Sequence, residues 1–169
     1  MSIVTKSKIK LIIVEDHPLM RQGLISYLDD YFKIIGEASN GKEAIELLKE
    51  NEPDVIIMDI QMPIMSGHEA LIIIKKKYPK IKVIIFTMFF EGGFISEYIK
   101  NGASAFINKG CDPDVIVKAV NHIVSEGFYF DNVIKDNISS LALQNFSSNP
   151  DLFKSALTDR EIEVLKLIC

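Results

Sequence analysis

The sequence predicts a doubly wound α/β domain built on a parallel sheet, followed by a short further segment. Three observations support this fold class. Short β-branched runs alternate with helical patterns between residues 9 and 126. The runs are apolar at successive positions, as in parallel strands that helices cover on both faces. A length of 169 residues with 48% hydrophobic content is enough for one core and a small remainder.

The strands are expected at residues 9–14, 34–38, 55–58, 83–86 and 103–107, and the segments between them are expected to be helices. Capping signals support the helices. Asn40 and Ser66 are each followed three residues later by a glutamate, which is the spacing of a capping box. Asp112 stands before Pro113, a favoured first residue of a helix. Ligands of such a sheet bind at the carboxyl ends of its strands.

The composition changes after residue 126. Ser, Asn and Asp become frequent, which predicts a linker, and apolar residues between 134 and 141 keep a helical period, which predicts a short helix within it. Thr158 and Glu161 then form another capping box at the start of an amphipathic helix. We therefore expect a domain at residues 8–126, a linker at 127–156, and at 157–169 the first helix of another domain, cut off at the last residue.

Charge and composition limit the kind of protein. The sequence has 19 Lys and Arg against 23 Asp and Glu, a formal net charge of −4, so no strong basic field exists to hold nucleic acid or an anionic membrane by itself. No apolar stretch reaches the length of a membrane span, and the run before Glu15 is too short for a secretory signal. Cys111 and Cys169 supply neither a disulfide framework nor a metal-ligand pair. We expect a cytoplasmic protein that makes no membrane contact.

Polar residues of particular types follow four of the predicted strands. Glu15 and Asp16 follow the first strand, Asp59 the third, Thr87 the fourth and Lys109 the fifth. Because these strand ends converge, the three carboxylates are expected to meet and to need a cation, and Mg²⁺ (or Mn²⁺) prefers such oxygen ligands. The lysine and the threonine hydroxyl supply donors for a phosphoryl group. Asp59 is then expected to be a carboxylate nucleophile toward phosphorus that forms an aspartyl phosphate.

Each of these residues has a plainer interpretation when it is taken alone. A single Asp at a strand end is more often a turn or cap residue, and a lone Lys in a loop is usually a solvated surface group. The acidic pair could cap a helix, and a threonine at the end of a strand follows from its β-propensity. The hypothesis of a phosphoryl site therefore depends on their conjunction.

At this point the chain resembles the bacterial response-regulator receiver domains over residues 8–126. The segment 58–67, Met-Asp-Ile-Gln-Met-Pro-Ile-Met-Ser-Gly, is similar to the family's phosphoacceptor segment. Glu15 and Asp16 resemble its acidic pair, and residues 102–109 resemble its fifth strand and lysine. The resemblance implies the flavodoxin-like strand order 2-1-3-4-5.

The resemblance also implies the roles of the site residues and the partners. A sensor histidine kinase would phosphorylate Asp59, and Thr87 and Lys109 would bind the phosphoryl oxygens. The implied metal ligands are Glu15, Asp16, Asp59 and the backbone carbonyl of Gln61. On phosphorylation Thr87 would move toward the phosphoryl group and Phe106 would turn inward, although an ordinary buried strand aromatic is an equally good interpretation of Phe106.

Two further features concern assembly and output. The fifth predicted helix carries more apolar residues than one buried face needs, which predicts a homodimer contact through the receiver helices. Residues 157–168 resemble the opening helix of the LuxR-type helix-turn-helix of the NarL/FixJ group. The recognition helix that would enter the major groove is absent from this chain. Promoter DNA is therefore an expected partner only of the intact protein, which would act as a transcriptional regulator.

Other functions that share single features are disfavoured by particular residues. Residues 36–42 match the spacing of a P-loop, but Glu43 occupies the position of the Ser or Thr that would bind Mg²⁺. The acidic residues after the first strand would repel the phosphate of a flavin. Gln61 stands where phosphatases with an Asp nucleophile carry a second Asp, so we expect a signalling switch and not an enzyme. The remaining alternative is a protein–protein interaction module that works without phosphorylation.

Overall fold

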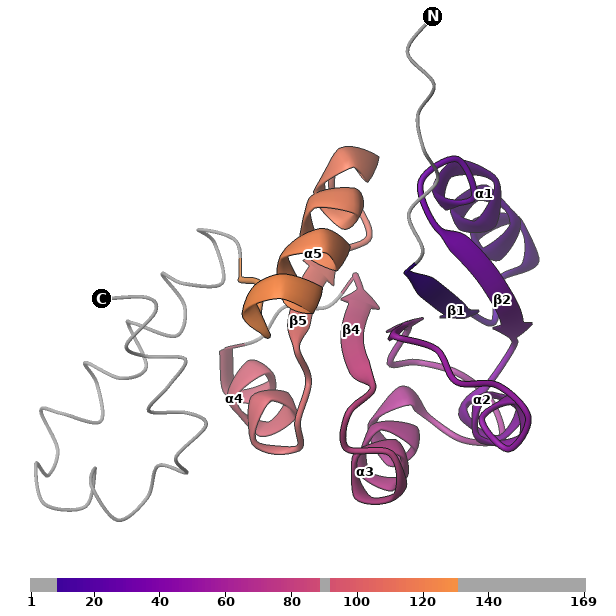
Figure 1. Cartoon of the computed structure of the whole chain (residues 1–169). Coiled ribbons are helices and arrows are strands. Elements are labelled where there is room, and N and C mark those ends of the chain that lie inside the picture. Colours follow the sequence, from indigo (N-terminus) through magenta and orange to yellow (C-terminus); the bar gives the residue numbers. More distant parts are fainter. Residues whose placement is uncertain (1–8, 89–91, 131–169) are drawn as a thin grey trace, which may run out of the picture.

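A computed structural model describes residues 9–88 and 92–130 of the chain as five parallel strands with helices on both faces (Figure 1). The strand order β2-β1-β3-β4-β5 confirms the predicted doubly wound α/β fold. The elements in chain order are β1 (Lys10–Val14), α1 (Pro18–Leu28), β2 (Lys33–Ala38), α2 (Gly41–Leu47), β3 (Val55–Met58), α3 (Gly67–Lys77), β4 (Lys82–Thr87), α4 (Gly92–Lys100), β5 (Ala105–Asn108) and α5 (Pro113–Glu126).

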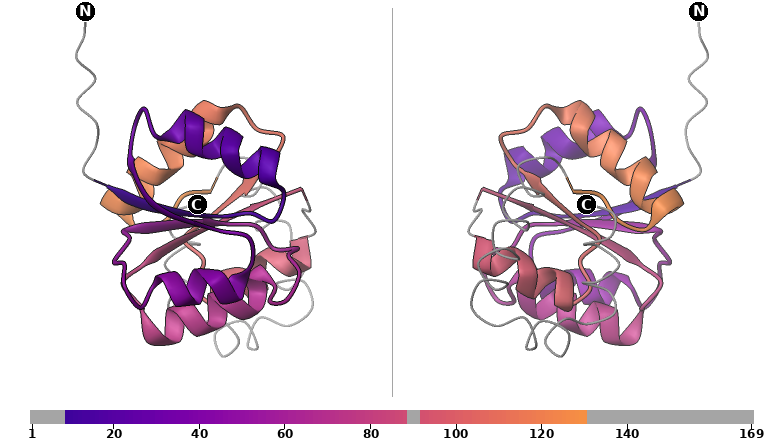
Figure 2. Two further views of the ribbon diagram at one scale, coloured as in Figure 1. Left: turned by 90° about the vertical axis from the view of Figure 1, so that its right-hand side faces the viewer. Right: turned by 90° about the vertical axis from the view of Figure 1, so that its left-hand side faces the viewer.

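The sheet separates two hydrophobic clusters. Helices α1 and α5 cover one face, and α2, α3 and α4 cover the other (Figure 2). We call the cluster between the sheet and helices α2, α3 and α4 the α2–α4 cluster, and the cluster between the sheet and the two helices α1 and α5 the α1–α5 cluster. Successive residues of a strand point to opposite faces. Ile12 therefore belongs to the α2–α4 cluster and Ile13 to the α1–α5 cluster, and both side chains are fully buried. All four residues of β3 are buried. Burial on both faces explains why the strands read as continuous apolar runs.

Local signals explain where the helices begin. Ser66 and the glutamate three residues later form a complete capping box at α3. The Asn40 side chain accepts a hydrogen bond from the Glu43 amide at 3.0 Å, and Asp112 caps α5 ahead of Pro113. No predicted strand boundary differs from the observed one by more than two residues, and the largest difference is the start of β5 at Ala105.

One glycine fixes the distance between a strand end and a helix. A Cβ atom on Gly67, the first residue of α3, would lie 2.0 Å from the carbonyl oxygen of Asp59. The Gly67 amide instead donates a hydrogen bond to the Ile60 carbonyl at 2.9 Å. The absence of a side chain therefore lets α3 begin directly against the end of β3.

The chain continues past α5 along the edge of the sheet. Gly127, with a φ of 95°, ends α5, and Tyr129 then forms an isolated parallel bridge with Ala105 of β5. Phe130 is buried in the α2–α4 cluster. The predicted linker helix and the predicted helix after Thr158 lie outside the described residues. Within the described part of the chain, no helix is long and apolar enough to cross a membrane.

Candidate functional site

The predicted site residues come from the ends of four adjacent strands, β1, β3, β4 and β5. Glu15 and Asp59 directly follow β1 and β3, and Thr87 ends β4; all three are buried, with exposed fractions of 1%, 5% and 0%. The Lys109 amide donates to the Thr87 carbonyl at 3.0 Å, which fixes the start of the loop after β5. The order of the sheet thus brings these four residues to one edge.

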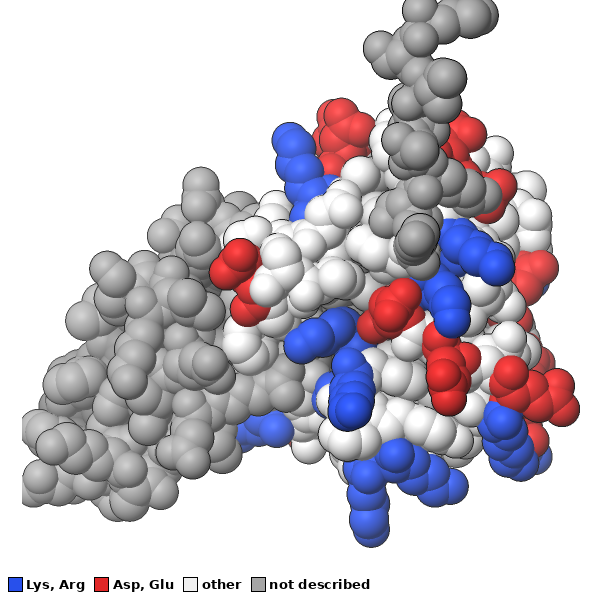
Figure 3. Space-filling model, viewed as in Figure 1, with Lys and Arg blue, Asp and Glu red and all other residues white. Residues whose placement is uncertain are grey.

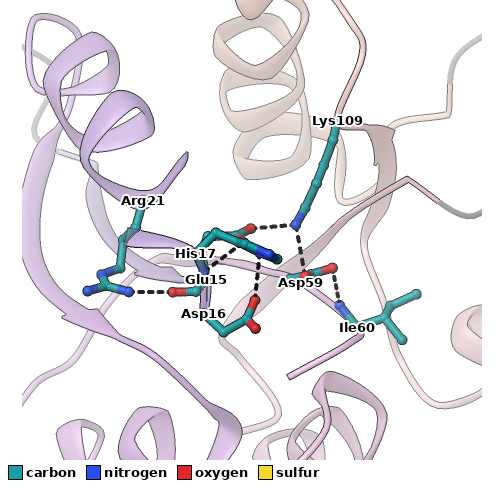
Figure 4. Close-up of polar contacts among 7 residues, drawn as sticks. All are labelled: Glu15, Asp16, His17, Arg21, Asp59, Ile60 and Lys109. Atoms are coloured by element: carbon teal, nitrogen blue, oxygen red, sulfur yellow. Dashed lines mark hydrogen bonds and ion pairs between the residues drawn. The ribbon is translucent and has the colours of Figure 1, made fainter. Parts of the chain in front are cut away.

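Lys109 joins two of the carboxylates (Figure 4). Its Nζ atom donates to Asp59 Oδ2 at 2.8 Å and lies 2.6 Å from Glu15 Oε2. Asp59 Oδ1 accepts a hydrogen bond from the Ile60 amide at 2.7 Å. Asp59 is therefore held on one oxygen by the backbone amide of Ile60 and on the other by the ammonium group of Lys109.

The site is electrostatically unbalanced. Burial by itself would lower the pKa of Lys109, but its hydrogen bond to Asp59, its close contact with Glu15 and the negative charges of both outweigh burial and raise this pKa. The ammonium group therefore stays charged at neutral pH. This ammonium group contacts the carboxylates of Glu15 and Asp59, and the neighbouring Asp16, whose side chain is partly exposed, adds a third carboxylate to the site. The Arg21 guanidinium does not contribute, because it binds Glu37 and the backbone carbonyl of Glu15.

The acidic pair fits a cation. Glu15 Oε2 and Asp16 Oδ1 are buried oxygen atoms that accept no hydrogen bond of normal geometry, although Glu15 Oε2 lies at ion-pair distance from Lys109. Glu15, Asp16 and His17 each offer one ligand atom within 4.8 Å of the others. Buried carboxylate oxygens without a full set of donors are the chemistry that a hard divalent cation satisfies.

His17, which from sequence is expected to be solvated or to cap a helix, also lies beside the acidic pair. Its Nδ1 atom lies 3.1 Å from Glu15 Oε1 and 3.1 Å from Asp16 Oδ1, while 74% of its side chain is exposed. The only signal in the sequence was its position directly after the acidic pair. Gln61 is exposed and lines a groove of about 600 Å³ that Asp16 also lines. The structure therefore places Gln61 and Asp16 at the rim of the site.

The residues expected to form a switch and a dimer contact are mostly buried. Phe106 is 2% exposed and its ring contacts the ring of Tyr98. In α5, Val115 and Val117 are partly buried against the α1–α5 cluster, whereas Val124 is 44% exposed. Much of the apolar surface that suggested a homodimer is therefore used within the chain, and the dimer remains a prediction.

Comparisons with known proteins agree with this geometry. The response regulator receiver domain family matches residues 11–121. The transcriptional regulatory protein LnrK of Bacillus subtilis (strain 168) is 36% identical over 93% of this chain and 75% of the relative. The transcriptional regulatory protein DegU of Brevibacillus brevis is 31% identical over 98% of this chain and 76% of the relative. This chain thus spans about three quarters of the length of either relative.

Solved structures give the same family. A crystal structure of a two-component response regulator of the LuxR family from Aurantimonas sp. SI85-9A1 matches with a TM-score of 0.75 and 28% identity, covering 81% of this chain and 99% of that one. A DNA-binding response regulator of the LuxR family from Staphylococcus aureus matches with a TM-score of 0.66 and 34% identity, covering 69% and 99%. The fold, the four strand ends and these matches lead to one conclusion: the chain belongs to the two-component response regulators, through a receiver domain whose relatives are transcriptional regulators of the LuxR/NarL type.

Proposed function

We propose that this protein is a phosphorylation switch that accepts a phosphoryl group on Asp59 from the phosphohistidine of a sensor histidine kinase. The observation that carries the proposal is the contact of Lys109 with both Asp59 and Glu15 in a buried cluster of carboxylates. A buried cation beside a nucleophile is suited to offset the charge that a phosphoryl group brings.

In the proposed transfer, an Asp59 oxygen forms a P–O bond while the P–N bond of the phosphohistidine breaks. The histidine nitrogen keeps the electron pair of the broken bond, and a neutral imidazole leaves if the other ring nitrogen carries a proton. Lys109 follows the charge from the carboxylate oxygen to a phosphoryl oxygen, and the Thr87 hydroxyl donates to another. The Ile60 amide keeps the second Asp59 oxygen in place.

The residues that would hold Mg²⁺, or Mn²⁺, are the carboxylates of Glu15, Asp16 and Asp59 and the backbone carbonyl of Gln61. When bound, the metal would offset negative charge on the carboxylates and on the phosphoryl oxygens. The proposal is supported by the buried oxygens of Glu15 and Asp16 that accept no hydrogen bond. Because Gln61 offers no acid or base for rapid turnover, the protein acts as a signalling switch and not as an enzyme.

The proposed output follows from the relatives, whose printed names describe transcriptional and DNA-binding regulators. Phosphorylation would change the receiver surface formed by α4, β5 and α5, and would thereby change homodimerisation through the receiver helices. The intact protein would then bind promoter DNA through a domain that follows the receiver. Thr87 and Phe106 are the residues proposed to pass the change from Asp59 to this surface.

The test is the intact mass of the protein after incubation with Mg²⁺ and acetyl phosphate. We expect a gain of one phosphoryl group that requires the metal and disappears in Asp59→Ala. The matched control is Asp30→Ala, which removes an exposed aspartate of the same chain and should not change the gain. If no gain appears after rapid quenching and beryllofluoride does not bind, the proposal fails and an interaction module that works without phosphorylation takes its place.

A further inference from the structure

Three aromatic side chains form a column beside the candidate site. This aromatic column consists of His68 in α3, Tyr98 in α4 and Phe106 in β5. The ring centroids are 5.0 Å apart for His68 and Tyr98 and 5.4 Å apart for Tyr98 and Phe106, and the planes meet at 80° in both pairs. Edge-to-face contacts at such distances are favourable beyond the burial of area. The column therefore joins three elements of the fold.

The inner end of the column is inside the core. Tyr98 is 4% exposed and Phe106 2% exposed, and both belong to the α2–α4 cluster. Phe106 pairs in register with Ile85 of β4, two residues before Thr87. Since residues two apart share a face of a strand, Phe106 lies beside the row of β4 residues that ends at Thr87. This is its position in a structure where Lys109 binds the Asp59 carboxylate.

The outer end of the column reaches the rim of the site. The His68 side chain is 30% exposed, and its Nε2 atom lies 3.4 Å from Glu97 Oε1. His68 and Tyr98 also line the groove of about 600 Å³ that contains Asp16. The Tyr98 ring is therefore held from both sides, by Phe106 toward the core and by His68 toward the surface.

This arrangement opposes an outward rotation of Phe106. Rotation would break the contact with Tyr98 and open a void under α4, and Tyr98 cannot follow without leaving His68. Burial, reinforced by the charges of Glu97 and Asp59, raises the pKa of Tyr98 to about 12. The Tyr98 side chain therefore stays neutral at physiological pH, as its buried position requires.

We propose that Tyr98 is a positioning residue that holds Phe106 inside the core before phosphorylation, so that the inward position is preset and not induced. The inference rests on the proposed function, in which the inward ring accompanies a phosphoryl group at Asp59. A residue that favours the inward position of Phe106 must then also raise the affinity of the site for the phosphoryl group. The reason is that this residue and the phosphoryl group both shift the equilibrium between the inward and outward positions of the ring.

The position of the ring can be measured directly. The chain contains no tryptophan, so Phe106→Trp introduces a single fluorescent reporter. We expect a buried emission maximum that does not move when Mg²⁺ and beryllofluoride are added. Combining Phe106→Trp with Tyr98→Ala should move the maximum to longer wavelength, and beryllofluoride should reverse the shift. The matched control is Tyr31→Ala, which removes a half-buried tyrosine from the opposite face and should leave the emission unchanged.

A second measurement keeps Phe106 and follows beryllofluoride binding by fluorine NMR. Tyr98→Ala should weaken binding by about fivefold or more, as expected for coupling between two sites. Tyr98→Phe keeps the ring and should restore the affinity of the parent chain. A tyrosine that merely filled space would lower stability without this difference in affinity.

Two results would overturn the inference. The first is a Tyr98→Ala variant that binds beryllofluoride as tightly as the parent chain does. The second concerns the Phe106→Trp variant that retains Tyr98: its emission maximum would move to shorter wavelength when beryllofluoride is added. If the parent chain binds no beryllofluoride, the proposed function itself fails. The emission of the ligand-free variants still decides in that case whether Tyr98 holds the ring.

Discussion

The two ends of the sheet use the same residue types with opposite consequences. At the carboxyl end, Lys109 Nζ lies 2.6 Å from Glu15 Oε2, and the side chains are 7% and 1% exposed. On α2 and just beyond it, Lys49 Nζ lies 2.6 Å from Glu46 Oε2, and the side chains are 59% and 58% exposed. Lys49 borders a groove of about 1130 Å³ at the amino end that is lined by the partly exposed Lys82 and by five exposed lysines: Lys10, Lys33, Lys49, Lys77 and Lys80.

The comparison shows that the N···O distance of an ion pair does not determine how much the pair contributes to stability. Water screens the exposed pair and can replace either partner, whereas water has little access to the buried Lys109 and Glu15 side chains. Figure 3 shows basic and acidic side chains interspersed over the face viewed there, with lysines gathered over α3. Water screens those exposed charges, whereas at the opposite end of the sheet one buried ammonium group contacts two buried carboxylates.

The largest effect is expected from removing the buried ammonium group. Lys109→Met leaves Glu15 and Asp59 as buried charges without a cation, and we expect a loss of about 3–5 kcal/mol of unfolding free energy at neutral pH. Urea unfolding measures the loss, and intact mass should show no phosphoryl gain. The control is Lys118→Met, which removes an exposed lysine of α5 and should change neither quantity. Equal stability of the two variants would contradict the importance given to burial.

The pH dependence of the same pair gives a second test. The pKa of Lys109 is raised in the folded chain above its ordinary value of 10.5. Its contribution to stability is therefore complete below pH 10.5 and is lost as the pH rises through the higher folded value. The stability difference between the parent and Lys109→Met should shrink above pH 10.5. A difference that grew with alkaline pH would show that the sign is wrong.

The next effect concerns the close approach of α3 to β3. Gly67→Ala should cost about 2–3 kcal/mol, because a methyl group 2.0 Å from the Asp59 carbonyl oxygen forces the two elements apart. Phosphoryl gain should fall in the same variant. Gly23→Ala in α1 is the matched control: its methyl group meets nothing within 4 Å, and a helical alanine should add about 0.5–1 kcal/mol. Thermal unfolding of both variants separates the two outcomes.

A smaller gain is expected in the loop between Asp59 and α3. Ile64 has a φ of 68° and a side chain that is 79% exposed. A β-branched residue is strained in this conformation and has little contact to compensate, so Ile64→Gly should raise the unfolding free energy by about 0.5–1 kcal/mol. Chemical unfolding would detect the gain. A destabilised variant would show instead that the exposed side chain makes a stabilising contact.

The smallest effect is expected for the exposed pair. Lys49→Met should leave the midpoint of urea unfolding unchanged, because solvent screens the contact with Glu46. High salt should likewise have no measurable effect on this variant relative to the parent. A large loss would remove the distinction between the two ends of the sheet.

The sequence predicted the parts of this structure that depend on local pattern. Continuous apolar runs located the strands, capping residues located α2, α3 and α5, and polar residues after the runs identified the candidate site. Long-range contacts could not be read in this way. Nothing near Phe106 in the sequence indicates that Tyr98 and His68 contact it in a column, because periodicity places a side chain on a face but does not name its neighbour across helices. The φ of Ile64 likewise follows from how the loop is closed and not from its residue type.

The bridge between Ala105 and Tyr129 has a practical consequence for dividing the protein. The strand order leaves β5 at the margin of the sheet, where unpaired backbone groups invite strand addition by another molecule. Tyr129 occupies part of this margin, with its amide donating to the Ser104 carbonyl at 3.0 Å. A receiver shortened to residue 126 would lose that cover together with Phe130, and would be prone to self-association. An autonomous folding unit should therefore extend at least to residue 130.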